Sequence, residues 1–316
     1  MMTSETLDAR GEPRVATRGR SSRWQRLRRG DLLPALLFIS PWIMGFLAFQ
    51  LYPIAASVFY SFSDYNMMQP PRFVGLANFA RLFGQDDLFR RALANTAVYA
   101  LVSVPLNLVV ALFFALLLNL NIPGRAIFRT AFYFPAIVPS VAMAILWVML
   151  LNAQGGLVNV AIGALGFNAI PWLTSPAWSM PALILISVWG IGPIVVIFLA
   201  GLQDVPRVLY EAGELDGAGP FRLVFDVTLP MLSPVILFNL VIGMIGALQE
   251  FALPFIMFDG GGPLNSVLMY SVQLYTVAFQ QFRLGYAAAM AWILFVIIFT
   301  LSLLAMRLSQ RFVHYE

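Results

Sequence analysis

Residues 210–234, YEAGELDGAGPFRLVFDVTLPMLSP, form the longest polar island between two strongly apolar runs of the chain. The segment carries four acidic residues; a fifth, Asp204, precedes it, and Arg207 and Arg222 lie close by. Apolar runs of the flanking kind are typical of transmembrane helices. We therefore expect a partly helical segment at a membrane face, with a spanning helix on each side. A polar, partly helical segment in this position is what we expect of a docking element for a soluble partner.

The first half of the segment has the pattern of a short amphipathic helix. Pro206 suits a first helical position because its φ is fixed near the helical value. Leu209, Ala212 and Leu215 recur at helical spacing and form one apolar stripe. The sequence thus predicts a short helix within residues 206–219.

A break and a second helix are expected to follow. Glycine accepts a left-handed φ, and proline cannot continue the helical hydrogen-bond ladder. Gly217 and Gly219, followed by Pro220, should therefore end the first helix. Phe221, Val224 and Phe225 begin a second apolar face. We expect this face to end near the Leu-Pro pair, Leu229 and Pro230.

This segment resembles the EAA loop of ABC importer permeases. That loop carries Glu-Ala-Ala, an Asp-Gly-Ala shortly after it and a Leu-Pro further on. The matching residues are Glu211-Ala212-Gly213, Asp216-Gly217-Ala218 and Leu229-Pro230. Gly213 replaces the family's alanine, which destabilises a helix by about 1 kcal/mol. The alternative interpretation is an ordinary amphipathic loop between two helices.

The composition excludes most soluble classes and most catalytic chemistry. The chain is 60% hydrophobic and 11% charged, far from the averages of soluble proteins. It has no cysteine and one histidine, His314, near its end, so thiol chemistry and most histidine-based catalysis or metal binding are excluded. We expect no catalytic residue, no metal site and no cofactor.

Six apolar runs are long enough to cross a bilayer as helices. The first is too long for the core of a signal peptide, so we predict an uncleaved anchor in which Pro41 and Pro53 are tolerated. The third run contains Pro135 and Pro139. The fold prediction is an all-α polytopic membrane protein whose six runs are residues 32–62, 92–119, 130–151, 179–202, 231–258 and 285–306.

The arginines indicate which side of the membrane each loop faces. Six crossings put both termini on one side. With the amino terminus inside, fourteen arginines lie in inner segments and five in outer segments, as the positive-inside rule requires. This orientation places the loop at residues 203–230 in the cytoplasm. The outer arginines are Arg72, Arg81, Arg90, Arg91 and Arg283.

Residues 1–31 form a basic tail with eight of the nineteen basic residues, all of them arginine. A nucleic-acid-binding arm would interleave aromatic residues with the basic ones, and the tail has only Trp24. We predict a largely disordered cytoplasmic tail that sets topology or contacts anionic membrane lipids, and no nucleic-acid partner.

Three more stretches resemble permeases of sugar importers. Residues 73–79, FVGLANF, match the phrase F-x-G-L-x-N-F that follows the first helix in that family. Residues 129–139 also resemble the family. Residues 260–263, GGGP, resemble its outer loop after the penultimate helix, and we expect a tight turn facing the cargo-binding protein. A phosphate cradle is excluded there, because the lysine and the strand-to-helix context are missing.

Few residues could contact a polar cargo inside the membrane. Glu250 lies inside the fifth run beside Gln249, and an ionisable group at membrane depth is a functional hypothesis because its burial in lipid is costly. It could instead pair with a neighbouring helix or lie near the outer interface. Asn239 and Asn107 are weaker candidates, since such amides often form hydrogen bonds between membrane helices.

Together, these motifs identify the chain as a member of the ABC importer permeases of the carbohydrate-uptake class, of the maltose and glycerol-phosphate type. The resemblance implies a type I importer transmembrane domain over residues 32–316 in the bacterial inner membrane, with both termini in the cytoplasm. It also implies a second permease subunit, two cytoplasmic ATPase subunits and an extracytoplasmic sugar-binding protein. The residues that the resemblance assigns to ATPase coupling are Glu211, Ala212, Gly213, Asp216, Gly217 and Ala218.

The chain lacks the Walker A pattern and has no lysine at all. In an ATP-driven mechanism, another polypeptide must therefore bind and hydrolyse the ATP. We therefore expect the chain itself not to be an enzyme. An ion-coupled secondary transporter of a polar solute is the main alternative, and it would need ion-coupling acids or broken-helix repeats. A membrane-bound enzyme would need a cluster of catalytic groups, which the single terminal histidine does not supply.

Overall fold

A computed structural model describes residues 32–120 and 123–309 of the chain, and these are largely helical. The predicted basic tail, residues 1–31, lies outside the described residues, as do Arg311 and His314. The chain up to Ala56 and the chain from Ser57 onward form two separate compact units.

The first predicted run is helical from end to end. Helix α2, Leu32–Phe46, continues through a π-helical turn, η1, Leu47–Leu51, into α3, Tyr52–Ser61. In a regular α-helix the ring of Pro53 would clash with the carbonyl four residues earlier. The wider π-helical turn lies directly before this proline, and Ala35–Ser61 is long and apolar enough to cross a membrane.

Short elements occupy the polar stretch after α3. Strand β1, Ser63–Asp64, pairs antiparallel with β2, Arg72–Phe73, in a two-stranded ribbon. Helix α4, Ala77–Gln85, follows. These are the only strands in the described part of the chain, so the all-α prediction describes the fold apart from this ribbon.

The motif at residues 73–79 closes this turn onto the end of α3. Gly75 takes a left-handed φ of 61°, which glycine adopts without the penalty that a side chain would bring. Asn78 donates two hydrogen bonds from Nδ2, each 3.0 Å long, to the carbonyls of Ser61 and Ser63. The order of residues in the motif therefore has a local structural reason.

Helix α5, Asp87–Asn119, contains the second predicted run and begins before the predicted residue 92. The Asp86 carboxylate accepts a hydrogen bond from the backbone N–H of Phe89 at 2.9 Å. Such a cap satisfies a donor that the first helical turn leaves free. This cap explains why α5 starts within the polar stretch that precedes the second predicted run.

The third predicted run is not one continuous helix, which corrects the sequence prediction. Helix α6, Arg125–Tyr133, passes through a 3-10 turn, η2, Phe134–Ile137, and the chain then turns by 101° into α7, Ser140–Leu150. Pro135 and Pro139 lie at this corner. Each lacks the N–H that a continuing helix would need, so the helix breaks here.

The fourth run is also broken. Helix α9, Pro176–Trp189, meets α10, Gly192–Asp204, at 47°. Gly192 lies so close to the backbone carbonyl of Phe132 that a Cβ atom would not fit. The glycine therefore lets the start of α10 pack directly on the α6 segment.

The fifth predicted run, residues 231–258, ends in a separate short helix, α14, Ala252–Met257. The segments between the third and fourth runs and between the fifth and sixth runs also contain short helical elements. These are α8, Leu157–Ala164; the 3-10 turn η4, Pro263–Asn265; α15, Tyr270–Tyr275; and the π-helical turn η5, Thr276–Gln280.

The Gly-Gly-Gly-Pro stretch forms a tight turn, as predicted. Gly260 and Gly262 have left-handed φ values of 90° and 68°. Asn95 of α5 holds the end of this turn by donating from Nδ2 to the carbonyls of Asn265 and Leu268, at 2.9 and 3.1 Å. The turn is thus fixed to the long helix.

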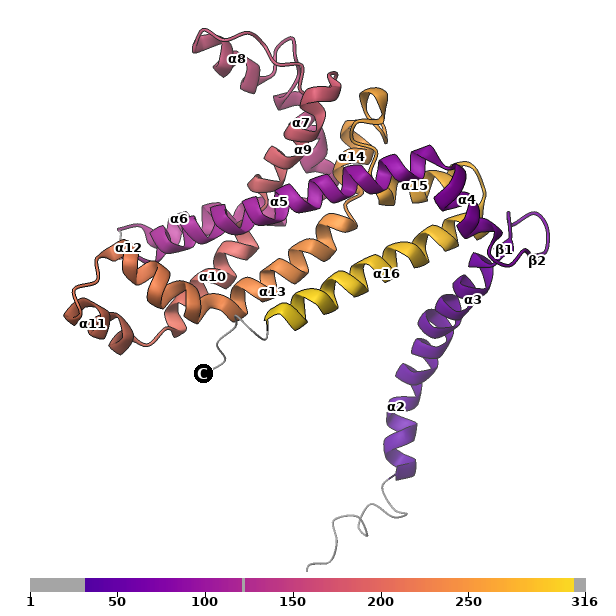
Figure 1. Cartoon of the computed structure of the whole chain (residues 1–316), viewed down its shortest axis with the longest axis horizontal. Helices are drawn as coiled ribbons and strands as arrows, with labels where there is room; N and C mark the ends of the chain where they lie inside the picture. Colours follow the sequence, from indigo (N-terminus) through magenta and orange to yellow (C-terminus); the bar gives the residue numbers. More distant parts are fainter. Residues whose placement is uncertain (1–31, 121–122, 310–316) are drawn as a thin grey trace, which may run out of the picture. The chain divides into compact units, whose positions relative to one another are not determined.

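Helices α13, Leu229–Leu248, and α16, Leu284–Ser309, pack along each other, and α13 also packs on α5 and α10 (Figure 1). Tyr270 is fully buried where α15 meets this bundle. Its hydroxyl donates to the carbonyl of Met290 at 2.7 Å, and its backbone N–H donates to the hydroxyl of Thr96 at 2.8 Å. One residue thereby joins α15 to α16 and α5.

The described residues hold four helices long and apolar enough to cross a membrane, and two bent pairs that pass the same test together. Counted as one span each, the bent pairs bring the total to six, in the order that the sequence predicts. The fold is thus an all-helical membrane domain whose third and fourth spans are bent.

We expect the substitution Gly285→Ala to destabilise the fold. Gly285 lies against the backbone carbonyl of Ser63, with no room for a Cβ atom. Overpacking of this kind lowers the free energy of unfolding by about 2 kcal/mol. In a thermal scan of the purified protein, that loss lowers Tm by roughly 4 °C.

Gly246→Ala is the matched control for this measurement. Gly246 also lies in a spanning helix, and a Cβ atom there would meet nothing within 4 Å. Alanine favours the helix at such a position, so Tm should not fall. An unchanged Tm in the Gly285 variant would contradict the close backbone contact.

Candidate functional site

The polar island contains a short helix, α11, Arg207–Leu215. Pro206 is its N-terminal capping residue, with an extended ψ of 130°, and not its first helical residue as predicted. A proline immediately before the helix still removes no hydrogen bond, because the first N–H groups of a helix have no partner within it.

Gly217 ends α11 in a Schellman motif. The backbone N–H of Gly217 donates to the carbonyl of Glu214 at 3.0 Å, and the N–H of Ala218 donates to the carbonyl of Gly213 at 2.9 Å. This pair of bonds needs a left-handed residue, and Gly217 supplies it with a φ of 79°. A Cβ atom at Gly217 would meet nothing within 4 Å, so the conformation alone favours glycine there.

Gly213 has a packing role that its sequence context did not reveal. A Cβ atom on Gly213 would lie 2.6 Å from the Cδ2 atom of Leu223. Alanine, the usual residue of the resembling motif, would fit only after the Leu223 side chain had moved. The departure from Glu-Ala-Ala thus allows a closer approach of α11 to the helix that follows.

That second helix does not end at the Leu-Pro pair, which corrects the prediction. Helix α12, Pro220–Leu223, runs through a π-helical turn, η3, Val224–Thr228, directly into α13, and all of Pro220–Met257 qualifies as one span. As before Pro53, the wider turn comes just before a proline, Pro230, whose ring would clash in a regular α-helix.

Side-chain hydrogen bonds hold α11 against this helix. The hydroxyls of Tyr210 and Thr228 lie 3.0 Å apart, and Thr228 also donates to the carbonyl of Leu223 at 3.3 Å. Arg222 and Asp226 form an exposed ion pair at 3.1 Å; pairs of this kind contribute little to stability. Both members of this ion pair lie in the second helix, so the contact between Tyr210 and the buried Thr228 is the side-chain hydrogen bond that links the two helices.

The polar island also exposes large apolar side chains. Leu215 is 90% exposed and Phe221 is 84% exposed, and Phe225 and Val208 are exposed as well. The predicted stripe residues Leu209 and Ala212 are exposed too. Clustered apolar exposure marks an interaction surface. We refer to Glu211, Leu215, Phe221 and Phe225 as the loop surface.

Acidic groups accompany this apolar exposure. Glu211, Glu214 and Asp216 are exposed, and none of them forms an ion pair within the described residues. Gly217 and Ala218 hold the turn behind them. The six predicted coupling residues thus lie on one helix and its terminal turn, next to uncovered apolar side chains.

The end of α10 next to this loop is held by two arginines. With its amide oxygen facing them, Gln203 accepts hydrogen bonds from Arg125 and Arg129 Nη2 atoms at 3.2 and 3.1 Å. These contacts join α6 to α10 at the point where α10 leads into α11. The sequence analysis counted Arg125 and Arg129 among the inner arginines and did not predict this contact.

A second candidate site is a polar cavity of about 170 Å³ between α5, α10 and α13. Of the predicted cargo residues, Glu250 and Asn239 line it, and so does Asn107. Gln249 is exposed and does not line the cavity. The structure therefore brings three of the four candidate side chains together and leaves Gln249 outside.

The hydrogen bonds of these side chains differ from one another. Asn107 accepts a hydrogen bond from the Ser187 hydroxyl at 3.3 Å, which joins α5 to α9 as expected for a membrane amide. Asn239 donates to the carbonyl of Val235 in its own helix at 2.9 Å. Glu250 lies in the break between α13 and α14 and accepts from the backbone N–H of Leu253 at 3.3 Å.

Sequence reasoning missed two polar residues of this cavity, Tyr99 and Ser103. With Asn107 they recur every four residues along α5, which places their side chains on one helical face. This spacing is the signal that could have found them. The cavity wall thus offers hydroxyl, amide and carboxylate groups, which can both donate and accept hydrogen bonds.

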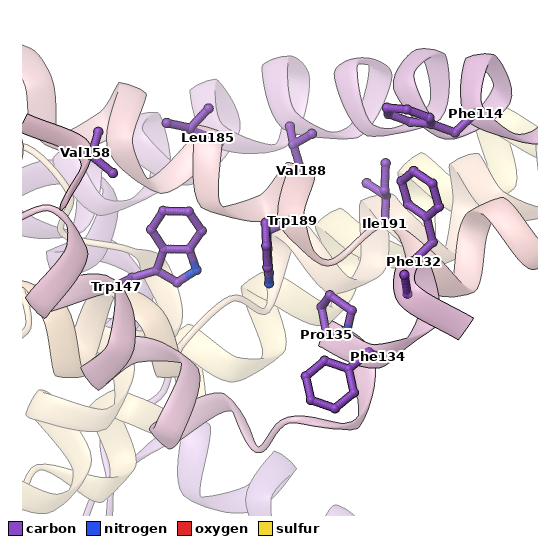
Figure 2. Close-up of a pocket in the computed structure, with 11 residues that line it drawn as sticks. Phe114, Phe132, Phe134, Pro135, Trp147, Val158, Leu185, Val188, Trp189 and Ile191 are labelled. Carbon is purple, nitrogen blue, oxygen red and sulfur yellow. The ribbon is translucent and has the colours of Figure 1, made fainter. Parts of the chain in front are cut away.

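A larger hollow has a different character. It is an apolar groove of about 820 Å³ at the two bent pairs, and Figure 2 shows aromatic side chains such as Phe132, Phe134, Trp147 and Trp189 around it. No charged side chain lines it. The only polar side-chain groups in its lining are the indole N–H groups of Trp147 and Trp189, which donate hydrogen bonds but accept none. The small polar cavity offers both donors and acceptors, so it is the better cargo site.

Residues 107–314 match the family model described as "Binding-protein-dependent transport system inner membrane component". This match covers α5 from Asn107 onward and all later described elements. It therefore includes both the loop surface and most of the polar cavity.

Relatives that align with most of the chain are named as permease proteins. The probable ABC transporter permease protein YesP of Bacillus subtilis (strain 168) is 42% identical over 291 residues, covering 91% of this chain and 94% of that protein. The diacetylchitobiose uptake system permease protein NgcF of Streptomyces coelicolor (strain ATCC BAA-471 / A3(2) / M145) is 34% identical over 306 residues, covering 92% and 86%.

A solved structure shares the fold. The chain superposes with a TM-score of 0.77 and 26% identity on a chain of the bacterial alginate ABC transporter in complex with alginate pentasaccharide-bound periplasmic protein. The alignment covers 92% of this chain and 97% of that one. The bent third and fourth spans thus belong to a fold that a known transporter adopts.

Proposed function

Because this chain belongs to the family of binding-protein-dependent transport system inner membrane components, we propose that it is the permease subunit of an ATP-driven importer of a sugar or sugar-like solute. NgcF belongs to an uptake system for diacetylchitobiose, and the structural neighbour is an alginate transporter. Both cargoes are carbohydrates. The polar cavity agrees with such a cargo, because its hydroxyl, amide and carboxylate groups match sugar hydroxyls.

The loop surface is the observation that carries the proposal of a soluble ATPase partner. A helix with exposed acids, ended by a fixed glycine turn, stands beside large apolar side chains that the described chain leaves uncovered. A partner that buries Leu215 and Phe221 gains roughly 1.5–3 kcal/mol for each side chain. Basic groups on that partner would pair with Glu211.

The proposed mechanism follows from what the loop connects. Helix α10 ends where the loop begins, and α13 continues the helix in which the loop ends. Both helices line the polar cavity, through Ile194 and Asn239. If ATP binding closes the partner ATPases, displacement of α11 moves these two walls and changes access to the cavity, a shift between two global states.

The proposed assembly contains four further subunits, and its orientation follows from the arginines. These subunits are a second permease, two cytoplasmic ATPases and an extracytoplasmic binding protein. An orientation with the loop surface and both termini in the cytoplasm gives fourteen arginines on the inner side and five on the outer side, and the positive-inside rule supports this orientation.

An ion-coupled secondary transporter is not favoured. The described residues contain no group of three or more acidic, histidine or cysteine side chains that could hold an ion, and Glu250 is the one acidic residue of the polar cavity. The family model that matches residues 107–314 describes a component of binding-protein-dependent transport systems.

Cysteine labelling tests the orientation. The chain has no native cysteine, so Glu214→Cys and Ala153→Cys each provide a single exposed thiol. In sealed right-side-out vesicles, an impermeant maleimide should label Ala153→Cys at once and Glu214→Cys only after permeabilisation. Labelling of Glu214→Cys from outside would contradict the orientation and the cytoplasmic loop surface.

Substitution of Glu250 tests the polar cavity. Loss of a charge-assisted hydrogen bond of about 1.5–3 kcal/mol should reduce solute uptake by Glu250→Gln about tenfold or more. Glutamine still accepts the hydrogen bond from Leu253, so assembly and basal ATP hydrolysis should remain. Gln249→Ala, beside it but outside the cavity, is the matched control. Failure of Glu250→Gln to assemble would instead show a packing role.

Two substitutions test the loop surface. Gly217→Asp places a side chain at a left-handed φ, which costs about 1–2 kcal/mol and reorients the end of α11. Glu211→Lys reverses the charge offered to the ATPase. Both variants should accumulate in the membrane, because the residues face water, yet show uptake below about a tenth of normal.

Gly219→Asp is the control for the glycine turn. Gly219 is equally exposed and a Cβ atom there meets nothing, but its φ of −73° suits any residue. Membrane abundance, co-purified ATPase and uptake are measured together for each variant. Normal uptake with Gly217→Asp and Glu211→Lys would remove the loop surface from the mechanism.

A further inference from the structure

A third hollow, separate from the groove and the polar cavity, opens where α4, the start of α5, η5 and the start of α16 meet. Its volume is about 320 Å³. We refer to it as the outer arginine pocket; its polar lining residues are Arg81, Gln85, Asp86, Gln273, Gln281, Arg283 and Tyr286. None of these residues lines the polar cavity.

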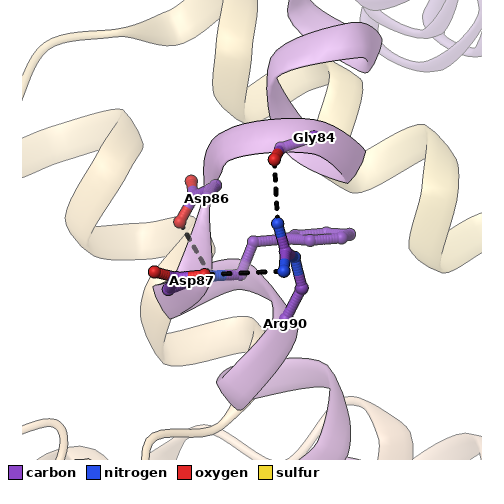
Figure 3. A network of polar contacts seen from close by, with 5 residues as sticks. Gly84, Asp86, Asp87 and Arg90 are labelled. Carbon is purple, nitrogen blue, oxygen red and sulfur yellow. Dashed lines mark hydrogen bonds and ion pairs between the residues drawn. The ribbon is translucent and has the colours of Figure 1, made fainter.

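The one carboxylate of this pocket is already engaged. Asp86 accepts a hydrogen bond from the backbone N–H of Phe89 at 2.9 Å and another from the Tyr286 hydroxyl at 2.7 Å. Figure 3 shows the first of these bonds, and beside it Arg90, which pairs with Asp87 and the carbonyl of Gly84. Asp86 is thus a structural cap that also holds α16.

Two guanidinium groups of the pocket have no carboxylate partner. Within the described residues, the ion pairs are Arg90 with Asp87 and Arg222 with Asp226. Neither Arg81 nor Arg283 takes part. The Arg283 guanidinium lies 4.3 Å from the ring centroid of Tyr286, a cation–π contact that holds it in place. The pocket therefore holds two guanidinium groups against one carboxylate, Asp86, and carries a net positive charge.

A buried amide adds a second, independent observation. Gln273 is 4% exposed and lines the pocket, and its side chain forms no hydrogen bond among the described residues. The buried side-chain atoms without a partner in the described residues do not include those of Gln273, so its amide is open to the pocket. An occupant with oxygen atoms can accept hydrogen bonds from this amide, so the amide points to a ligand as the two arginines do.

The chemistry of the lining selects a carboxylate. Guanidinium groups bind carboxylates through two parallel hydrogen bonds, and the Gln85, Gln273 and Gln281 amides can donate to the same oxygens. A neutral sugar fits less well, because the one aromatic ring of the pocket, Tyr286, is already covered by Arg283.

The position of the pocket in the fold indicates which molecule supplies the carboxylate. Helix α5 begins at the pocket and ends at Asn119, near α6 and α10, which lead to α11. The pocket and the loop surface therefore lie at opposite ends of the helical bundle (Figure 1). If the loop surface faces the ATPase, the pocket faces the side on which the binding protein docks.

We propose that the outer arginine pocket binds an acidic side chain, aspartate or glutamate, of the solute-binding protein. This inference rests on the proposed function. Docking inserts the carboxylate between Arg81 and Arg283, and the buried Gln273 amide completes its hydrogen bonds.

The test uses the complete transporter in lipid nanodiscs and its purified binding protein. Binding is measured by biolayer interferometry at low and at high salt for wild type, Arg81→Gln, and Arg81→Gln with Arg283→Gln. The double variant should bind about tenfold more weakly at low salt and lose most of the salt dependence. Arg91→Gln, an exposed outer arginine outside the pocket, should bind as wild type does.

The outcomes separate this proposal from the proposed function. If wild type binds and the double variant binds equally well with the same salt dependence, the pocket proposal alone is wrong. If wild type binds no binding protein and no ATPase co-purifies, both fail. Arg81 is exposed, so Arg81→Gln should fold normally. If Arg283→Gln impairs folding, the binding and salt dependence of Arg81→Gln alone test the pocket proposal. Galacturonate, with galactose as control, tests a free sugar acid: arginine-dependent binding of galacturonate alone would overturn the protein source.

Discussion

A lipid bilayer contains no water to satisfy backbone groups, so each N–H and C=O of a spanning segment needs a partner within the protein. This constraint bears on the local structure at four of the chain's prolines, while Pro41, Pro105, Pro181 and Pro234 lie inside helices that continue through them. π-helical turns lie directly before Pro53 and Pro230 and let those helices continue. Where Pro135 and Pro139 fall close together, the helix breaks instead, and a glycine, Gly192, lets the next span pack into the corner. The helical spans and the packing around the polar cavity depend on these π-helical turns, this break and this glycine contact.

Hydrogen bonds to backbone and side-chain groups also make the loop between α10 and α13 stiff. The Schellman bonds at Gly217 use the last carbonyls of α11, and the Tyr210–Thr228 contact fixes α11 on the following helix. That helix then enters α13 without a flexible linker. A force on α11 therefore acts on α13, and a loop of this construction suits the proposed coupling better than a mobile one would.

The apolar runs predicted the order and approximate ends of the spans, because length and hydropathy depend on local sequence. The left-handed Gly217 and the Gly-Gly-Gly-Pro turn were also predictable, since few residues other than glycine adopt such a backbone. The approach of Gly213 to Leu223, and the polar face of Tyr99 and Ser103, depend on which helices become neighbours. Neither could be read from a motif. The sequence did not predict that the helix of α12 and η3 continues past Pro230 into α13, because proline usually ends helices. The π-helical turn that prevents the clash has no sequence signature.

Helix α5 connects the three sites that the function would require. Its capping residue, Asp86, lies in the outer arginine pocket; Tyr99, Ser103 and Asn107 face the polar cavity; and its far end packs near α6, which contacts α10 beside the loop. At a rise of about 1.5 Å per residue, this helix is about 50 Å long. A close-packed helix shifts as a body and does not bend continuously. Docking at one end and displacement of the loop at the other would therefore act on the same element, and each would favour one of its positions over the other.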